Sequence, residues 1–307
     1  MTENTTSSLP RIGWIGTGVM GVAMAGHLID AGYELTVYNR TASKAEPLCQ
    51  KGAKLAASVR EVAENSDVVF TIVGMPSDVW TVLTDENNGV IAHIKEGGIV
   101  CDMTTSSPFL ASSFAEKGLE RGVFVLDAPV TGGDVGARNA TLSIFAGGDK
   151  QAYETILPIL NCMGKSMMYC GEAGMGQKAK LANQVAIAGV MFSVCESLLF
   201  AAQAGLDVRE WHSLVVKGAA GSTAMGTLGS RMMDGDDEPG FFIDHFVKDL
   251  GLVLDQCRFM KIVLPGAELA DRFYRHMQQN GYGKKGTQAL IKALAEFSGK
   301  EWHAIKK

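Results

Sequence analysis

The sequence predicts an α/β domain with a doubly wound, mainly parallel sheet, followed by an all-helical domain. Between Arg11 and about Cys170, short apolar runs alternate with helical patterns, which is the order of a parallel sheet with crossover helices. Several runs lack polar alternation, as expected for strands that helices cover on both faces. After Gly171 we find no comparable strand pattern, and the remaining sequence is typical of helices.

The elements follow from apolar runs and from the residues that interrupt them. The expected strands lie at 11–16, 34–39, 67–73, 98–103, 123–128 and 141–147. The expected helices of the second half lie at 174–204, 207–217, 241–261, 265–280 and 286–297. We therefore expect a flexible N-terminal tail over 1–10, an α/β domain over 11–172 and a helical domain over 173–307, joined through the long helix.

Composition narrows the class of protein. With 47% apolar and 20% charged residues, the 307-residue chain is typical of a globular protein. A net charge of -5 gives no support to binding of nucleic acid or an anionic membrane. The six cysteines form no C-x-x-C pair, which favours reduced thiols in a cytoplasmic protein. The six histidines are scattered along the chain, so we expect no metal site. No apolar segment is long and uncharged enough to predict a membrane span.

A glycine-rich motif directly follows the first expected strand. It has the pattern G-x-G-x-x-G and comprises Gly16, Thr17, Gly18, Val19, Met20 and Gly21. Glycines allow the backbone to approach a pyrophosphate closely, and the N-terminus of the next helix attracts its charge. Between a strand and a helix, the motif predicts a dinucleotide site. The alternative is an ordinary glycine-rich turn.

Residues at the end of the second expected strand bear on the choice of cofactor. An NAD site usually carries an acid here for the ribose 2′-hydroxyl. This chain has Asn39, Arg40 and Thr41, with Lys44 nearby. A guanidinium and a hydroxyl bind a 2′-phosphate, which an acid would repel, so the sequence favours NADP over NAD. A solvated surface arginine is the alternative.

Two further segments follow expected strands, where ligands bind in open α/β sheets. In the segment 127–137, Gly132 and Gly133 follow Thr131 and leave backbone amides uncovered, as a carboxylate site requires. A mobile hairpin loop would give the same pattern. In the segment 102–108, the hydroxyls either face a ligand or cap the next helix.

The long apolar helix begins with polar side chains at helical spacing. Lys180, Asn183 and Gln184 share one face, because residues three and four apart are neighbours on a helix. Hydride transfer from an alcohol requires an acceptor for the hydroxyl proton, and an amine whose pKa burial has lowered can serve. The two amides would hold the hydroxyl or carboxylate of a substrate. The alternative is a lysine that extends into solvent from the helix end.

The sequence resembles the β-hydroxyacid dehydrogenase family over residues 12–294. Four stretches carry the resemblance, in the order IGTGVMGVAMAGHL, DAPVTGGDVGA, GMGQKAKLANQ and VKDLGLVLD. The resemblance implies a Rossmann-type domain joined by a long helix to a helical domain, usually in a homodimer or homotetramer. It implies Lys180 as the catalytic residue and substrate binding by Thr131, Gly132 and Gly133. The cofactor contacts that it implies are Met75, Pro76, Thr105 and Lys248.

Three departures from the family pattern lie near the expected substrate. The family commonly has asparagine where this chain has Gln184, and Ala140-Thr141 replaces the usual Gly-Thr. The turn GYGKKGTQAL lacks an acidic residue often found there. We therefore expect an NADP-preferring oxidoreductase, with NAD possible, that acts on a small carboxylate-bearing 3-hydroxy acid or its semialdehyde. A different carbonyl or imino substrate, or a cofactor-binding protein without catalysis, is the alternative.

Overall fold

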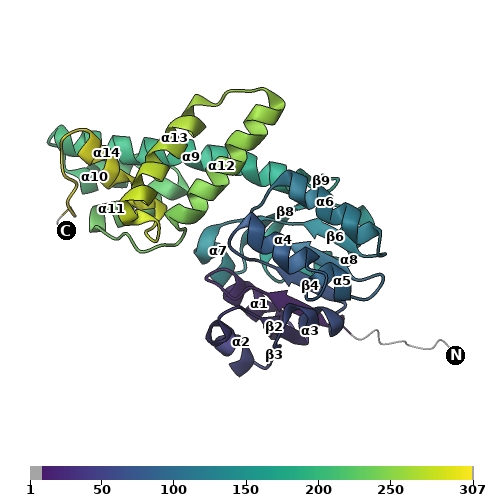
Figure 1. The fold of residues 1–307 in the computed structure, drawn as a ribbon. Coiled ribbons are helices and arrows are strands. Elements are labelled where there is room, and N and C mark those ends of the chain that lie inside the picture. Colours follow the sequence, from purple (N-terminus) through teal and green to yellow (C-terminus); the bar gives the residue numbers. More distant parts are fainter. Residues whose placement is uncertain (1–8, 306–307) are drawn as a thin grey trace. The chain divides into compact units, whose positions relative to one another are not determined.

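The structure, a computed structural model, describes residues 9–305 (Figure 1). Of the expected N-terminal tail, residues 1–8 lie outside the described part, and Leu9 is exposed. The chain divides into two compact units, of which the first ends at Lys180 and the second begins at Leu181. This division falls inside the long helix α9 (Met175–Gln203), whereas the sequence predicts a boundary just before it, at 172/173.

The first unit is built on a nine-stranded sheet. Its strands are β1 (Ile12–Ile15), β2 (Leu35–Tyr38), β3 (Lys54–Leu55), β4 (Val68–Thr71), β5 (Ile99–Asp102), β6 (Phe124–Asp127), β7 (Val130–Thr131), β8 (Leu142–Gly147) and β9 (Gly164–Gly171). The order is β3-β2-β1-β4-β5-β6-β8-β7, with β9 beside β8. Strands β1 to β6 pair in parallel, and β8 runs antiparallel to β6 and β7. The strand order reverses between β1 and β4, where open α/β sheets bind ligands.

Helices cover both faces of this sheet, so the expected doubly wound architecture is confirmed (Figure 1). The helices are α1 (Gly21–Asp30), α2 (Glu46–Gln50), α3 (Val59–Glu64), α4 (Pro76–Thr84), α5 (Val90–His93), α6 (Pro108–Leu119), α7 (Gly133–Arg138) and α8 (Lys150–Leu160). Alternate strand residues enter two separate cores: Phe70 packs with α1 and α8, whereas Val69 packs with α3 to α6. Burial on both faces explains why the strands lack polar alternation.

Three strands differ from the sequence prediction. Strands β3 and β7 have two residues each, too few to produce a pattern. Strand β9 is longer, but its residues 165 and 166 are exposed, so it lacks an apolar run. The structure also replaces the mobile-hairpin alternative for the segment after Asp127 with β7 and the start of α7.

The named elements of the second unit, in its described part, are all helices, and one isolated β-bridge pairs Phe242 with Gly286. After α9 the unit contains α10 (Val208–Val215), the π-helix η2 (Met225–Gly229), α11 (Ser230–Asp234), α12 (Ile243–Met260), α13 (Pro265–Met277), the π-helix η3 (Gln278–Tyr282), the 3-10 helix η4 (Thr287–Ala289) and α14 (Leu290–Phe297). The five expected helices are present, and α11 and η2 are additional. The core forms around one stripe of α9 that includes Ala188, Met191, Cys195 and Leu198.

Helix α9 corrects one expectation from the sequence. It is 29 residues long and contains an 18-residue window of mean hydropathy 2.0, so its length and composition would suffice to cross a membrane. The sequence was expected to contain no apolar segment long and uncharged enough for a membrane span, and by length and composition α9 is such a segment. Of that window, 39% is buried within the protein, and its stripe at helical spacing packs into the core of the second unit.

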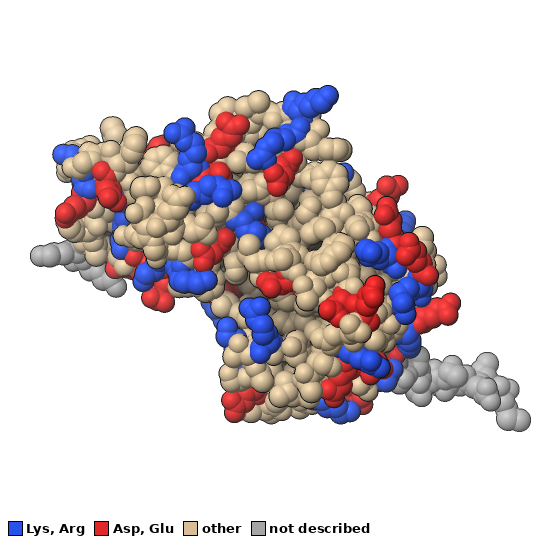
Figure 2. All heavy atoms as spheres, viewed as in Figure 1, with Lys and Arg blue, Asp and Glu red and all other residues tan. Residues whose placement is uncertain are grey.

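Positive and negative side chains are interspersed on the face of the molecule in Figure 2.

Candidate active site

The glycine-rich turn lies between β1 and α1, and two of its glycines are required by close packing. Gly16 has a φ of +101°, and a Cβ there would lie 2.1 Å from the carbonyl oxygen of Ile72. A Cβ on Gly21 would lie 2.1 Å from the carbonyl oxygen of Gly16. A Cβ on Gly18, in contrast, would meet nothing within 4 Å. The space beside Gly18 is therefore open, and in this motif the pyrophosphate approaches the backbone at that glycine.

Side chains beside the turn hold it and leave one polar atom unsatisfied. The backbone N–H of Thr17 donates to Asn39 Oδ1 at 2.9 Å, and Asn39 Nδ2 donates to the carbonyl oxygen of Thr41. Asn39 therefore connects the end of β2 to the turn after β1. The hydroxyl of Thr17 is buried without a hydrogen-bond partner in the described part of the chain. A bound phosphate oxygen would satisfy this hydroxyl.

Arg40 lies at the end of β2 with a side chain that is 89% exposed. Its Nη1 is 3.7 Å from Asp78 Oδ1, and Asp78 Oδ2 accepts a hydrogen bond from the backbone N–H of Met75. Met75 immediately precedes α4, which begins at Pro76. The exposed guanidinium is available to a phosphate, because an ion pair this exposed contributes little. Lys44 is also exposed, in the 3-10 helix η1 (Ala42–Ala45).

Two buried carboxylates end the adjacent strands β5 and β6. Asp102 and Asp127 are partners in the parallel register, and both are at least 96% buried. Asp102 accepts hydrogen bonds from the hydroxyl of Thr71 and from the backbone N–H of Thr104. Burial, with a smaller contribution from the charge of Asp102, raises the pKa of Asp127 to about 7 although two backbone amides donate to it.

The loop after β5 contacts the beginning of α9. Gln177 is fully buried; its Oε1 accepts from the backbone N–H of Ser106, and its Nε2 donates to the carbonyl oxygen of Thr104. The hydroxyl of Thr104 accepts from the backbone N–H of Val73. Ser107, at the helix start, makes no side-chain capping bond, so hydroxyl capping of α6 is not observed. Thr105 lies between these anchored residues.

The substrate-binding candidates of the first unit lie where β7 leads into α7. Gly132 and Gly133 have φ values of +130° and +63°, which only glycine adopts readily. A Cβ on Gly133 would meet nothing within 4 Å, so its backbone is open to a ligand. Thr131 ends β7 and is half-buried. Lys180, in the second turn of α9, is 92% buried, which corrects the alternative of a solvated lysine.

The remaining candidates belong to the second unit and form a buried polar network. Gln184 Nε2 donates to Asp249 Oδ2 at 2.6 Å, and its Oε1 accepts from Asn183 Nδ2 at 2.9 Å. Lys248 Nζ lies 2.8 Å from Asp249 Oδ1, an ion pair whose side chains are 8% and 2% exposed. Both ends of the Gln184 amide therefore have protein partners. From helical spacing this amide is expected to face the ligand, whereas here it bonds to Asp249 and Asn183.

His245 lies one turn before Asp249 on α12. Its ring is 5.5 Å from that of Phe242, and burial followed by the charge of Lys248 lowers its pKa. Within residues 9–305, no group of three or more histidine, cysteine or acidic side chains is arranged to hold a metal ion.

The fold and the glycine-rich turn define a Rossmann-type dinucleotide-binding protein. Residues 11–171 match the family model described as the NAD binding domain of 6-phosphogluconate dehydrogenase. Residues 174–294 match the model described as NAD-binding of NADP-dependent 3-hydroxyisobutyrate dehydrogenase. The chain belongs to the β-hydroxyacid dehydrogenase family, as the sequence predicts, and is an oxidoreductase with a nicotinamide cofactor.

Similar proteins cover nearly the whole chain. A probable 3-hydroxyisobutyrate dehydrogenase-like protein of Arabidopsis thaliana, named as mitochondrial, is 50% identical over 95% of this chain and 87% of its own length. The 2-hydroxy-3-oxopropionate reductase of Escherichia coli is 36% identical over 92% of this chain and 97% of its own. The crystal structure of a 3-hydroxyisobutyrate dehydrogenase from Salmonella typhimurium has a TM-score of 0.84 at 30% identity, covering 92% of this chain and 99% of that one.

Proposed function

We propose that the protein transfers a hydride between NADP and a small 3-hydroxy acid or its semialdehyde, with Lys180 as general acid and base. The observation that carries this proposal is an amine buried in the second turn of α9, on the helix whose start is fixed to the ends of β5 and β6. An amine held at the reacting carbon can give a proton to the substrate oxygen or take one from it. In reduction the Lys180 ammonium gives a proton to the forming alkoxide, and in oxidation the amine takes it back.

Several residues fit a dinucleotide. The open space at Gly18 and the unsatisfied hydroxyl of Thr17 suit the pyrophosphate, at the N-terminus of α1. Arg40, Thr41 and Lys44 would face a 2′-phosphate. When bound, the nicotinamide supplies or accepts the hydride. The other proposed cofactor contacts are Gly16, Val19, Met20, Gly21, Asn39, Met75, Pro76, Thr105 and Lys248.

A carboxylate on the substrate suits the turn at Thr131, Gly132 and Gly133, because consecutive backbone amides form an anion site. Asn183 and Gln184 are further proposed substrate contacts. Engagement of Gln184 by a substrate would require its bond to Asn183 or Asp249 to be exchanged. The departure from asparagine here favours a different small carbonyl or imino compound as the second candidate. We also propose a cytoplasmic homodimer or homotetramer.

The direct test is a screen of NADPH oxidation against small semialdehydes, glyoxylate and cyclic imines, with NADH in parallel. We expect turnover with at least one carboxylate-bearing aldehyde. Turnover with imines alone would establish the second candidate. Cofactor binding without turnover on the whole panel would indicate a non-catalytic binding protein.

The preference for NADP has its own test. Arg40→Asp removes a charge-assisted contact and adds repulsion, so the Kd for NADPH should rise about tenfold or more while that for NADH changes little. Fluorescence titration with both cofactors measures this. An unchanged ratio of the two affinities would place Arg40 away from the 2′-phosphate.

A further inference from the structure

Helix α9 begins at a residue that cannot cap it. The position before Met175 is Gly174, which has no side chain to accept a hydrogen bond from the first turn. Helix starts leave such backbone N–H groups without partners, and a capping side chain normally satisfies one of them. In the described structure, a residue distant in the sequence accepts hydrogen bonds from two of these backbone N–H groups.

Asp127, at the end of β6, supplies the missing cap. Its Oδ1 accepts from the backbone N–H of Gly174 and its Oδ2 from that of Gln177, both at 2.7 Å. The carboxylate therefore bridges the first turn of a 29-residue helix, at the end where the helix dipole favours a negative charge. Because Asp127 ends a buried strand of the sheet, this contact fixes the helix to a rigid element.

Two glycines admit this carboxylate, and a third lies against α6. A Cβ on Gly147 would lie 2.7 Å from Asp127 Oδ1, and a Cβ on Gly176 would lie 2.9 Å from Oδ2 and 2.6 Å from the carbonyl oxygen of Asp127. Gly174 has a φ of +89°, and a Cβ there would lie 2.6 Å from the carbonyl oxygen of Pro108. The G-M-G that opens the helix is thus explained by the close approach of β6 and α6, independently of any ligand.

Gln177 extends the same anchorage to the neighbouring strand. Its side chain bonds to Thr104 and Ser106 in the loop after β5, while its backbone N–H bonds to Asp127. Lys180 is three residues further along, so its Cβ lies on the same helical face as that of Gln177. Any tilt or fraying of the first turn therefore displaces Lys180.

We propose that Asp127 is a positioning residue for Lys180, acting through the two amides that it holds at the start of α9. This rests on the proposed role of Lys180 as the acid and base. When Asp127 is ionised, both of its carboxylate oxygens accept hydrogen bonds. When it is protonated, one oxygen becomes a donor and can no longer accept a hydrogen bond from its backbone amide. Displacement of a catalytic group by about 1 Å can lower the rate about 100-fold.

The charge of Asp127 connects the position of Lys180 to pH. The titratable groups that face it are Asp102 and Cys101 on β5 and Cys170 on β9. Burial raises the pKa of Asp127 to about 7, so the carboxylate becomes protonated as the pH falls through neutrality. In the direction of reduction Lys180 must be protonated to act as the acid. Lys180 would therefore lower the rate only on the alkaline side of the pH–rate profile. An acidic limb near pH 7 is then the signature of Asp127.

The test compares two isosteric substitutions in the full chain, Asp127→Asn and Asp67→Asn. Asp67 is another acid that holds several donors, but it lies at the opposite end of the strands, where its donors are Arg11 and Lys95. With NADPH and the aldehyde that the screen selects, we expect Asp127→Asn to lower kcat about 10- to 100-fold and to lose the acidic limb, with the KM for NADPH within about twofold. Asp67→Asn should lower Tm and leave kcat within about twofold.

A second variant tests the same inference if Asp127→Asn does not fold. Gln177→Met keeps the side-chain volume and removes both bonds to the loop after β5, so it should also lower kcat with little change in the KM for NADPH. In a Lys180→Ala background, Asp127→Asn should slow the residual reaction no further, because a positioning residue acts only through the group it positions.

Two results would overturn the inference: equal kcat for Asp127→Asn and Asp67→Asn, or the same further loss from Asp127→Asn with and without Lys180. Unchanged turnover in Lys180→Ala alone would instead overturn the proposed function. If Lys180→Ala is slow but Asp127→Asn has normal turnover, the proposed function stands and only the positioning role of Asp127 is wrong.

Discussion

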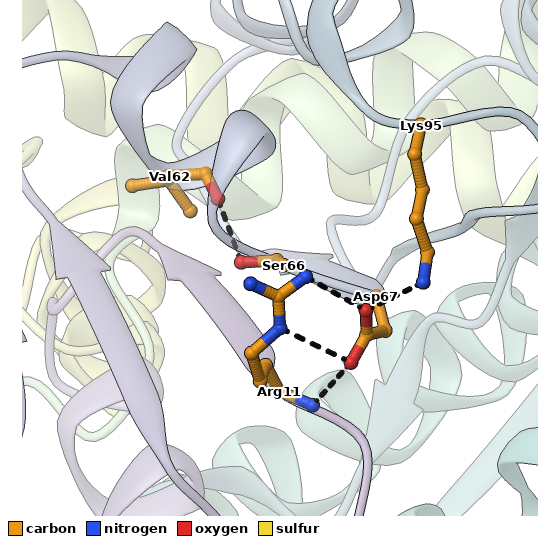
Figure 3. A network of polar contacts seen from close by, with 5 residues as sticks. All are labelled: Arg11, Val62, Ser66, Asp67 and Lys95. Atoms are coloured by element: carbon orange, nitrogen blue, oxygen red, sulfur yellow. Dashed lines mark hydrogen bonds and ion pairs between the residues drawn. The ribbon is translucent and has the colours of Figure 1, made fainter.

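Asp67 and Asp127 lie at opposite ends of the strands of one sheet, and their pKa values shift in opposite directions. Asp67 precedes β4, where it accepts from the backbone and guanidinium of Arg11 and from the ammonium of Lys95 (Figure 3). Burial pushes its pKa up, but these donors outweigh burial and the net shift is downward. Asp127 ends β6 and accepts from the backbone N–H groups of Gly174 and Gln177, and burial raises its pKa to about 7.

The amino end of the sheet pairs its charges, whereas the carboxyl end buries carboxylates together and leaves a polar group unsatisfied. At the amino end, the acid is paired with two cations and the neighbouring hydroxyl of Ser66 bonds to the carbonyl oxygen of Val62. At the carboxyl end, acids are buried together, the hydroxyl of Thr17 has no partner among the described residues, and space is left at Gly18. Strain and unsatisfied groups concentrate where ligands bind.

The opposite shifts have opposite consequences for stability. The lowered pKa of Asp67 means that its contribution is present above the ordinary value near 3.8 and is lost as the pH falls below it. The raised pKa of Asp127 means that its contribution is present below that value and is lost as the pH rises towards about 7. The ionised form that caps α9 is therefore the less stable one, as is common for functional groups.

The largest effect should come from removal of the amine at the carboxyl end. Lys180→Ala should retain the fold and the affinity for NADPH while turnover falls by about 10²- to 10⁴-fold, the usual scale for a positioned acid or base. Steady-state rates together with a fluorescence titration separate the two properties. Near-normal turnover would move the proton transfer elsewhere, with His245 as the next residue to test.

A smaller effect, on stability alone, should follow at the amino end. Asp67→Asn removes the charge that Arg11 and Lys95 neutralise, and because those partners are about half exposed the free energy of unfolding should fall by only about 1–2 kcal/mol. Urea unfolding at pH 7 measures this, and high salt should reduce the difference from the wild type. A loss of turnover at unchanged stability would contradict the contrast between the two ends.

The smallest effect concerns substrate choice in the second unit. Gln184→Asn shortens the side chain that bonds to Asp249 at 2.6 Å, and we expect the ranking of kcat/KM among semialdehydes to change by roughly tenfold. The affinity for NADPH should stay the same. If the ranking is preserved and only Tm falls, Gln184 supports the helix, and selectivity lies in the turn around Gly132 and Gly133 or elsewhere in the helical unit.

The sequence predicted the strands of the sheet and the glycine-rich turn well, because burial on both faces and a strand–turn–helix context leave local patterns. It did not predict strand β9, whose exposed residues break the apolar run. Nor did it predict the role of Asp127, because the cap depends on contacts 47 and 50 residues away in the chain. The one available sign was a helix start at Gly174 without a capping side chain.

The same limit applies to Gln184. Spacing along a helix correctly placed its Cβ beside those of Asn183 and Lys180, but it could not reveal that Asp249, 65 residues away, takes its amide. Local periodicity fixes the face on which a side chain lies, whereas its partners depend on how distant helices pack.

Substitution of Gly18 tests whether a dinucleotide binds at the glycine-rich turn, at the carboxyl end of the sheet. A Cβ there meets nothing within 4 Å, and the same is true of Gly266 near the start of α13, so Gly266→Ala is a matched control. Because the added methyl group would occupy the space meant for the pyrophosphate, Gly18→Ala should keep the wild-type Tm but raise the Kd for NADPH about tenfold or more, while Gly266→Ala leaves the Kd unchanged. Wild-type affinity for NADPH in folded Gly18→Ala would contradict the account.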